Sequence, residues 1–147
     1  MGTDAGEGRP LLIVDGANVV GSVPDGWWRD RRGAAERLRD ALVPLAAAGL
    51  PADAAGAPEW VIGAPLEVVL VVEGAARGVA AVPDVAVEAA PGSGDDLIAQ
   101  LAADARESTP ARRCLVATAD RGLRARISAV GAAWVGPRAV RPRPRRP

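Results

Sequence analysis

Apolar runs that end at an acidic residue, just before a helix-like pattern, are the feature that most limits how this chain can fold. The run 11–14 (Leu-Leu-Ile-Val) stops at Asp15, and two later strand-like runs are followed by Asp95-Asp96 and by Asp120. Continuous apolar runs of this length are typical of strands that are buried on both faces of a parallel sheet. Strands that alternate with helices in this order predict an α/β domain.

The expected elements alternate along most of the chain. Strands are predicted over 11–14, 66–72, 85–89, 115–118 and 132–135, and helices over 28–48, 95–107 and 121–130. Pro44 is expected to end or kink the first helix, because proline cannot donate the helical hydrogen bond. Residues 16–26 read as a tight turn and loop, and the Pro- and Gly-rich stretch 49–65 reads as a surface connector. We therefore predict a three-layer Rossmann-like sandwich around a mostly parallel sheet of about five strands.

Length and charge distribution indicate one folded domain with two unlike ends. A chain of 147 residues, of which 49% are hydrophobic, fits a single domain with a substantial core. We expect residues 1–9 to be disordered, residues 10–136 to fold, and residues 137–147 to form an Arg/Pro-rich tail. The tail carries arginines and no acid. Such a tail is typical either of a nucleic-acid contact or of a disordered, solubilising end.

The residue types that this chain lacks exclude several classes of chemistry. It has no His, which excludes His-based catalytic triads and His zinc sites. It has no Lys, which excludes a Walker-type phosphate loop and Schiff-base chemistry. The single cysteine, Cys114, lies in an apolar run and is expected to be a small buried hydrophobe rather than a nucleophile.

Targeting and membrane signals are not found in the sequence. The first eight residues include acids and no apolar stretch, which argues against a signal peptide. No apolar run approaches the roughly 20 residues that a membrane helix needs. One cysteine permits no internal disulfide, which is compatible with a reducing compartment. We therefore expect a cytoplasmic protein with no membrane partner.

The acids that follow the strands are expected to meet at one edge of the sheet. The carboxyl ends of parallel strands share that edge, and ligands bind there in α/β proteins. Asp15, Asp95 and Asp120 would repel one another unless a cation lay between them, and Asp96 is a further candidate ligand. Carboxylates are hard oxygen ligands that suit Mg²⁺ or Mn²⁺. The pattern predicts a divalent metal site that acts on phosphodiesters.

Each of these candidates also has an ordinary structural interpretation. Asp15 can accept a hydrogen bond in a turn, although a carboxylate at the end of an apolar strand is costly to bury unless it is paired or bound to a cation. Asn18 is either a turn or cap residue, or a group that orients Asp15 or a metal-bound water. Ser93 and Asp96 fit a capping box, and Asp120 can be a plain helix N-cap.

Several other side chains are candidates for substrate contacts. Trp27 and Trp28, with a cationic flank, can stack on unpaired bases, or they can fill a hydrophobic gap under the loop. Thr118 is a candidate for holding a water or a phosphate oxygen, and Arg121 is a candidate substrate contact. Glu73 ends the strongest predicted strand and is a weaker candidate for the acidic site.

In order and spacing, these motifs resemble the NYN domain family, a branch of the PIN-like nucleases that includes the YacP-type proteins. The resemblance covers about residues 11–136. It rests on Leu-Leu-Ile-Val-Asp15-Gly-Ala-Asn18, Gly-Trp27-Trp28-Arg-Asp30-Arg, Gly-Ser-Gly-Asp95-Asp96-Leu-Ile and Ala-Thr118-Ala-Asp120-Arg-Gly-Leu. It implies a PIN-like fold, acids that chelate a divalent cation, and RNA cleavage. Proteins of this kind often have another acid on an early helix, a place that Asp30 or Glu36 would fill here.

The resemblance and the residues together predict a ribonuclease that depends on Mg²⁺ or Mn²⁺. Asp15, Asn18, Asp95 and Asp120 would be the catalytic residues, and the ions would activate water and stabilise charge on the phosphodiester. The alternative is a non-catalytic RNA-binding module that uses the Arg-rich tail together with the adjacent tryptophans. RNA is the expected partner in both hypotheses, and a homodimer is left open.

Overall fold

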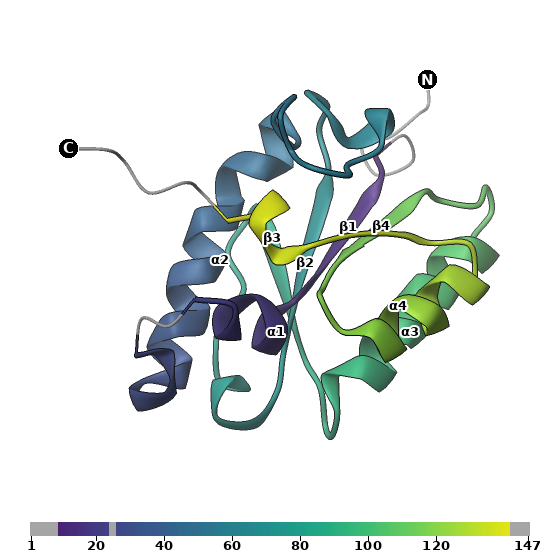
Figure 1. Ribbon diagram of the computed structural model, residues 1–147. Coiled ribbons are helices and arrows are strands. Elements are labelled where there is room, and N and C mark those ends of the chain that lie inside the picture. The colour runs from purple at the N-terminus through teal and green to yellow at the C-terminus, as the bar shows by residue number, and fades with distance from the viewer. Residues whose placement is uncertain (1–8, 24–25, 142–147) are drawn as a thin grey trace.

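In the part of the chain that the structure describes, five strands form one sheet at the centre of the fold (Figure 1). The computed structural model describes residues 9–23 and 26–141. Residues 1–8 of the segment 1–9 that was expected to be disordered, and residues 142–147 of the predicted tail, lie outside these ranges. The strands are β1 (Leu11–Asp15), β2 (Glu67–Val72), β3 (Val85–Ala89), β4 (Cys114–Ala117) and β5 (Ala133–Val135). They lie in the order β3-β2-β1-β4-β5, and every pair of neighbours is parallel. The predicted fold class is therefore confirmed.

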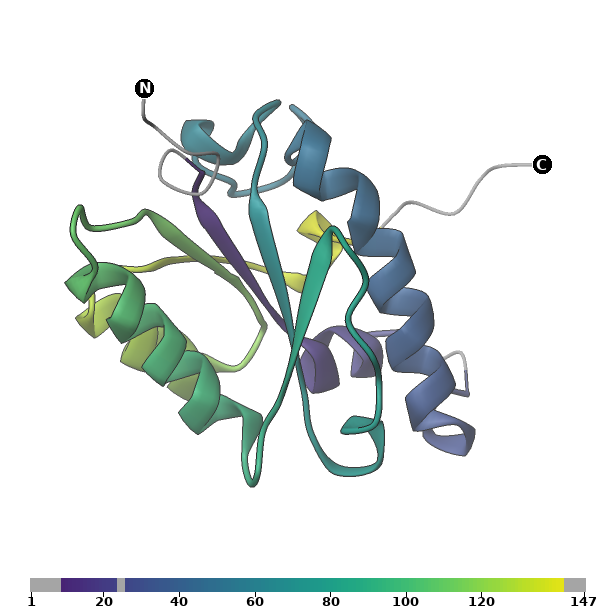
Figure 2. The same ribbon diagram turned by 180° about the vertical axis from the view of Figure 1, so that it is seen from behind.

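Helices cover both faces of the sheet, as Figures 1 and 2 show from opposite sides. They are α1 (Gly16–Gly21), α2 (Arg31–Ala48), α3 (Gly94–Glu107) and α4 (Arg121–Ala129). The pair α1 and α2 packs on one face, and the pair α3 and α4 packs on the other. Among the described residues, no helix has the length and apolarity needed to cross a membrane.

Strand β1 divides the hydrophobic core into two halves. All five of its residues are buried; Leu12 and Val14 face the α1–α2 layer, while Leu11 and Ile13 face the α3–α4 layer. Burial on both faces is the reason that this strand reads as a continuous apolar run. Cys114 is buried in the second half of the core, as predicted, and burial raises the pKa of its thiol to about 12. The thiol is therefore protonated at neutral pH and poorly nucleophilic.

The region between β1 and α2 differs from the sequence prediction in two ways. The expected tight turn after Asp15 is the first turn of α1, a helix too short to show a periodic pattern. The next helix begins at Arg31 rather than near Trp28, because the Asp30 carboxylate accepts a hydrogen bond from the Gly33 backbone N–H at 2.9 Å and caps α2. Residues Trp27–Arg29 form a separate 3-10 turn, η1.

Helix α2 also continues through Pro44 to Ala48, so of the two outcomes expected at the proline, an end or a kink, the helix does not end there. Pro44 lies on the exposed side of the helix, where water can satisfy the carbonyl that loses its partner. The connector 49–65 contains a second 3-10 turn, η2 (Glu59–Val61), and Leu50 and Val61 within it are fully buried. The connector is thus anchored to the core rather than being a simple surface loop.

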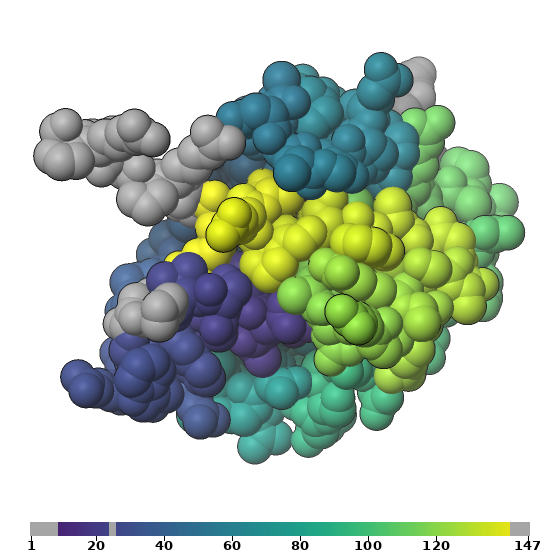
Figure 3. Space-filling model, in the orientation of Figure 1, coloured from purple at the N-terminus to yellow at the C-terminus, as the bar shows by residue number. Residues whose placement is uncertain are grey.

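The first residues of the Arg/Pro-rich segment pack against the domain. Residues Pro137–Ala139 form the short turn η4, and Val140 is only 3% exposed. The Arg141 guanidinium donates a hydrogen bond to the backbone carbonyl of Val19 in α1 at 2.8 Å. In Figure 3 this yellow segment lies across the front of the molecule, above the purple α1. The chain therefore stays in contact with the domain at least to Arg141.

The turn from β1 into α1 leaves no room for a side chain at Gly16. A Cβ atom there would lie 2.5 Å from the backbone carbonyl oxygen of Val71 in the neighbouring strand. We expect Gly16→Ala to lower the free energy of unfolding by about 1–3 kcal/mol, because relief of the clash must shift β1 or β2. Urea unfolding measures this change. The control is Gly92→Ala, whose Cβ would meet nothing within 4 Å; equal losses in both variants would contradict the prediction.

Candidate active site

Acidic residues from separate parts of the chain meet at the carboxyl edge of the sheet, which faces downward in Figure 1. Asp15 ends β1, Glu73 directly follows β2, Asp95 lies in the first turn of α3, and Asp120 precedes α4. Strands β2 and β3 lie one after the other on one side of β1. The chain then crosses to the other side of β1, where β4 and β5 lie. The order of strands thus reverses beside Asp15, and this reversal is where open α/β sheets bind their ligands.

Asp15 is the most buried of these acids, with an exposed fraction of 6%. The Thr118 hydroxyl donates a hydrogen bond to Asp15 Oδ2 at 2.8 Å, and the Asn18 backbone N–H lies 3.3 Å from Oδ1. Burial raises the pKa of Asp15, these hydrogen bonds lower it in part, and the negative charges of Asp95 and Glu73 raise it further. A carboxylate in this position is stabilised by a positive charge brought close to it.

Asp95 is affected by the same group of negative charges. Partial burial is the largest cause of its raised pKa, followed by the charges of Asp120 and Glu73, while Arg126 acts in the opposite direction. Glu73 and Asp95 therefore lie close enough to Asp15 to repel its charge, and Asp120 lies close enough to Asp95 to do the same. The structure places Asp15, Asp95 and Asp120 at the same edge of the sheet, where the charge of Asp95 acts on Asp15 and the charge of Asp120 acts on Asp95.

Glu73 is the site residue that sequence reasoning underestimated. Its carboxylate accepts a hydrogen bond from the Gly94 backbone N–H at the beginning of α3, which holds it beside Asp95. A Cβ at Gly94 would lie 2.5 Å from Glu73 Oε2, so the glycine permits this close approach. The signal in the sequence was the position of Glu73 directly after the strand that pairs with β1.

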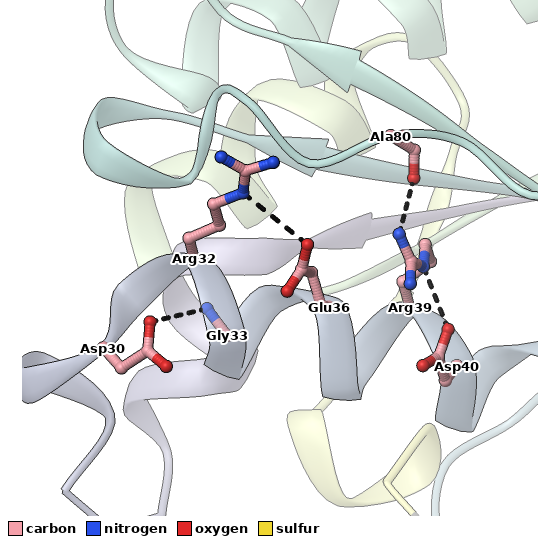
Figure 4. Close-up of polar contacts among 7 residues, drawn as sticks. All are labelled: Asp30, Arg32, Gly33, Glu36, Arg39, Asp40 and Ala80. Carbon is pink, nitrogen blue, oxygen red and sulfur yellow. Dashed lines mark hydrogen bonds and ion pairs between the residues drawn. The ribbon is translucent and has the colours of Figure 1, made fainter.

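Asp30 and Glu36, the two other candidates for an additional acid, make contacts within α2 or at its beginning (Figure 4). Asp30 caps the helix through the Gly33 backbone N–H, and the Glu36 carboxylate lies 3.6 Å from the Arg32 guanidinium. Of the three candidates for an additional acid, Glu73 is the one that the fold places among the strand-end carboxylates.

Asp96 differs from its neighbour Asp95 in its surroundings. Its side chain is 78% exposed and lies 3.0 Å from the Arg126 guanidinium in α4. Ser93 caps α3 by accepting a hydrogen bond from the Asp95 backbone N–H at 3.1 Å. Asp96 thus forms an ion pair between two helices and adds favourable charge at the beginning of α3.

Asn18 and Asp120 hold the two turns around Asp15 together. The Asn18 side-chain oxygen accepts a hydrogen bond from the Ala119 backbone N–H at 2.8 Å. The Asp120 carboxylate caps α4 by accepting from the Leu123 backbone N–H at 2.9 Å, and the Asp120 backbone N–H donates to Thr118 Oγ1 at 3.1 Å. Each of these residues has a structural function here in addition to its proximity to the acids.

Of the proposed substrate contacts, Trp27 and Trp28 divide into two roles. Their rings meet edge to face with centroids 6.0 Å apart. Trp27 is half-buried against the α1–α2 half of the core, as the alternative interpretation expected, whereas Trp28 is 51% exposed beside Arg29. Arg121 is exposed at the start of α4.

The donor set of this edge fits a hard divalent cation in its chemistry, since every candidate ligand is a carboxylate oxygen. In residues 9–23 and 26–141, however, no three acidic side chains lie close enough to surround one ion as they stand. Some of the acidic side chains would have to move toward one another before they could surround one ion. Asp15, Glu73 and Asp120 each accept a hydrogen bond from the protein, so movement would fall mainly on Asp95.

The buried hydrogen bond between Thr118 and Asp15 is expected to contribute to the free energy of unfolding. Thr118→Val keeps the shape of the side chain but removes the hydroxyl that donates to Asp15 and accepts from the Asp120 backbone N–H. We expect the free energy of unfolding to fall by about 1–3 kcal/mol, because buried polar groups lose their partner. Thr118→Ser retains the hydroxyl and should lose clearly less in the same chemical denaturation experiment. A neutral Thr118→Val variant would show that the pair contributes nothing.

The parallel sheet with helices on both faces defines a three-layer α/β fold of the Rossmann type. The crystal structure of the W164L mutant of Rae1 (YacP) from Bacillus subtilis superposes on this chain with a TM-score of 0.60. The alignment has 20% identity and covers 90% of this chain and 72% of that chain. The likeness is one of fold. No protein-family model matches the sequence, and no curated protein does.

Proposed function

We propose that this protein is a ribonuclease that depends on a divalent metal ion. The observation that carries the proposal is the buried carboxylate of Asp15 at the strand reversal, with the charges of Glu73 and Asp95 acting on it and the charge of Asp120 acting on Asp95. Two further facts support it: the motifs resemble those of the NYN family of PIN-like nucleases, and a YacP protein has the same fold.

Asp15, Glu73, Asp95 and Asp120 are the residues that would hold Mg²⁺ or Mn²⁺. When bound, such a cation supplies a Lewis acid that polarises a phosphoryl oxygen and lowers the pKa of water. Because the chain has no His, proton transfer falls to the carboxylates. Thr118 and Asn18 would act as positioning residues: the first orients Asp15, and the second joins the turn after β1 to the turn after β4.

RNA would reach the acids past positively charged and aromatic side chains. Arg29 lies over the ring of the exposed Trp28, and Arg31 lies over the ring of Trp27. Arginine contacts to phosphates give affinity that falls steeply with salt, and exposed aromatic rings can stack on unpaired bases. Single-stranded RNA is thus a better substrate for this surface than a duplex.

A non-catalytic RNA-binding module is the second candidate. The observation in its favour is that the acids do not surround an ion in their present arrangement among the described residues. Arginines at the edge of the domain, with Arg138 and Arg141 at the C-terminal end of its described part, would serve binding alone. This candidate predicts salt-sensitive binding that survives removal of the acids.

Incubation of the purified protein with end-labelled single-stranded RNA tests the proposal. We expect cleavage with Mn²⁺ or Mg²⁺ and none when EDTA is added, with a DNA strand of the same sequence as a comparison. If the RNA is bound but stays intact at all metal concentrations, the binding module is correct and the ribonuclease proposal fails. Cleavage that persists in EDTA would contradict the metal dependence.

A further inference from the structure

A tryptophan on the last strand lies exposed beside the acidic edge. Trp134 in β5 is 42% exposed, and β5 is an edge strand of the sheet. The guanidinium carbon of Arg124 in α4 lies only 3.6 Å from the centroid of the indole ring. One face of the ring is therefore covered by the arginine, and the exposed area lies on the part of the ring that the arginine leaves uncovered.

The stack of Arg124 on Trp134 is connected to the acidic site through Thr118. The Arg124 Nε donates a hydrogen bond to the Thr118 backbone carbonyl at 3.0 Å, and the hydroxyl of the same threonine donates to Asp15. The end of strand β5 is held next to Thr118, because the Thr118 backbone N–H donates a hydrogen bond to the Val135 carbonyl at 2.9 Å. The ring and the buried carboxylate thus lie on adjoining parts of one rigid framework.

We propose that Trp134 and Arg124 form a subsite in which an unpaired nucleobase of the RNA stacks on the part of the indole that the guanidinium leaves exposed. This inference rests on the proposed function, since the RNA strand whose phosphodiester lies at the acids supplies the base. An aromatic face accepts any base, so the subsite favours single strands without reading sequence. The guanidinium on the other face fixes the ring and supplies positive charge for a neighbouring phosphate.

Trp60 shows what a purely structural pair of tryptophan and arginine looks like in this protein. Trp60 also has an arginine over its ring, with Arg113 at 5.7 Å from the centroid, but it is half-buried against the core. Arg113 precedes β4, so this pair lies at the opposite edge of the sheet from the acids. Trp60 is therefore a matched control for the loss of a tryptophan that is paired with arginine.

The test is a binding measurement in EDTA, where cleavage is absent, with a fluorescent single-stranded RNA and a strand of equal length that contains abasic positions. Trp134→Leu is expected to weaken binding of the normal strand by about 5- to 150-fold. It should leave binding of the abasic strand unchanged, and Trp134→Phe should retain most of the affinity. Trp60→Leu should bind both strands like the wild type.

A second measurement on the unaltered protein covers the case in which Trp134→Leu does not fold. Ultraviolet crosslinking to RNA that contains 5-iodouridine should give an adduct on the peptide that carries Trp134. Absence of that adduct, or equal losses for normal and abasic strands, would overturn the subsite. Cleavage of RNA with unchanged affinity in Trp134→Leu would overturn the subsite and leave the ribonuclease intact. Binding that depends on the bases and on Trp134, without any cleavage, would support the subsite and overturn the ribonuclease proposal.

Discussion

Replacing Asp95 by Asn is expected to lower cleavage of single-stranded RNA by more than about 100-fold in the presence of Mn²⁺. Asp95 lies among the charges of Glu73 and Asp120, so its carboxylate is a candidate ligand rather than a surface charge. Removal of a ligand should cost at least as much as removal of a group that only supports one. Asp15→Asn is expected to have an effect of the same size. The measurement is the initial rate of cleavage at saturating Mn²⁺.

Asp96→Asn is the matched control for this loss. It makes the same change of charge one residue further along α3, but its side chain is exposed and paired with Arg126. We expect it to retain most of the activity. If Asp95→Asn and Asp96→Asn lose activity equally, negative charge at the start of α3 matters rather than the position of one carboxylate, and the proposed site is wrong.

Stability without metal should rise when a carboxylate is removed from the group. The folded protein holds Asp95 with a raised pKa, so its native state binds a proton more tightly than the unfolded chain does. The cost of ionising Asp95 is therefore absent below its unfolded pKa of about 3.9 and is added as pH rises through the higher folded pKa. In EDTA at neutral pH, Asp95→Asn should melt at a higher temperature than the wild type, and the difference should vanish in acid.

With Mn²⁺ present, we expect the wild type to melt at a higher temperature than Asp95→Asn. A ligand that binds only the folded state at 100 times its Kd stabilises it by about 2.7 kcal/mol, and Asp95→Asn should lose most of that gain. Asp120→Asn is less clear-cut, because Asp120 also caps α4, although asparagine is itself a good cap. Thermal melts with EDTA and with Mn²⁺ separate these effects. If Mn²⁺ shifts no melting temperature and Asp95→Asn is destabilising in EDTA, the acids do not form a cation site.

The strands and the main helices could be predicted because burial leaves a local pattern. Strand β1 is buried on both faces and reads as an uninterrupted apolar run that stops at Asp15. Helix α1 has only six residues and left no such pattern. The sequence could not decide whether α2 ends at Pro44, because the effect of a proline depends on which side of the helix meets water, and that is set by tertiary packing.

The site was predictable only as far as strand ends indicate a shared edge. Asp15, Asp95 and Asp120 follow from that argument, but the pairing of Asp15 with Val71 is what brings the end of β2, and hence Glu73, beside them. Adjacent helix residues differ by about 100° in direction, so sequence alone could not tell that Asp96 turns toward Arg126. The pairing of Trp134 with Arg124 could not be predicted from the sequence, because the two residues belong to different elements, β5 and α4.

A crystal of the protein grown with Mn²⁺ would identify the ligands of the ion through its anomalous scattering. We expect an anomalous peak at the carboxyl edge of the sheet, with carboxylate oxygens of Asp15 and Asp95 at roughly 2.0–2.2 Å, in the range of small hard cations. Asp96 should remain paired with Arg126. An anomalous peak at other acids, or none at an Mn²⁺ concentration that supports RNA cleavage, would contradict a metal site formed by Asp15, Glu73, Asp95 and Asp120.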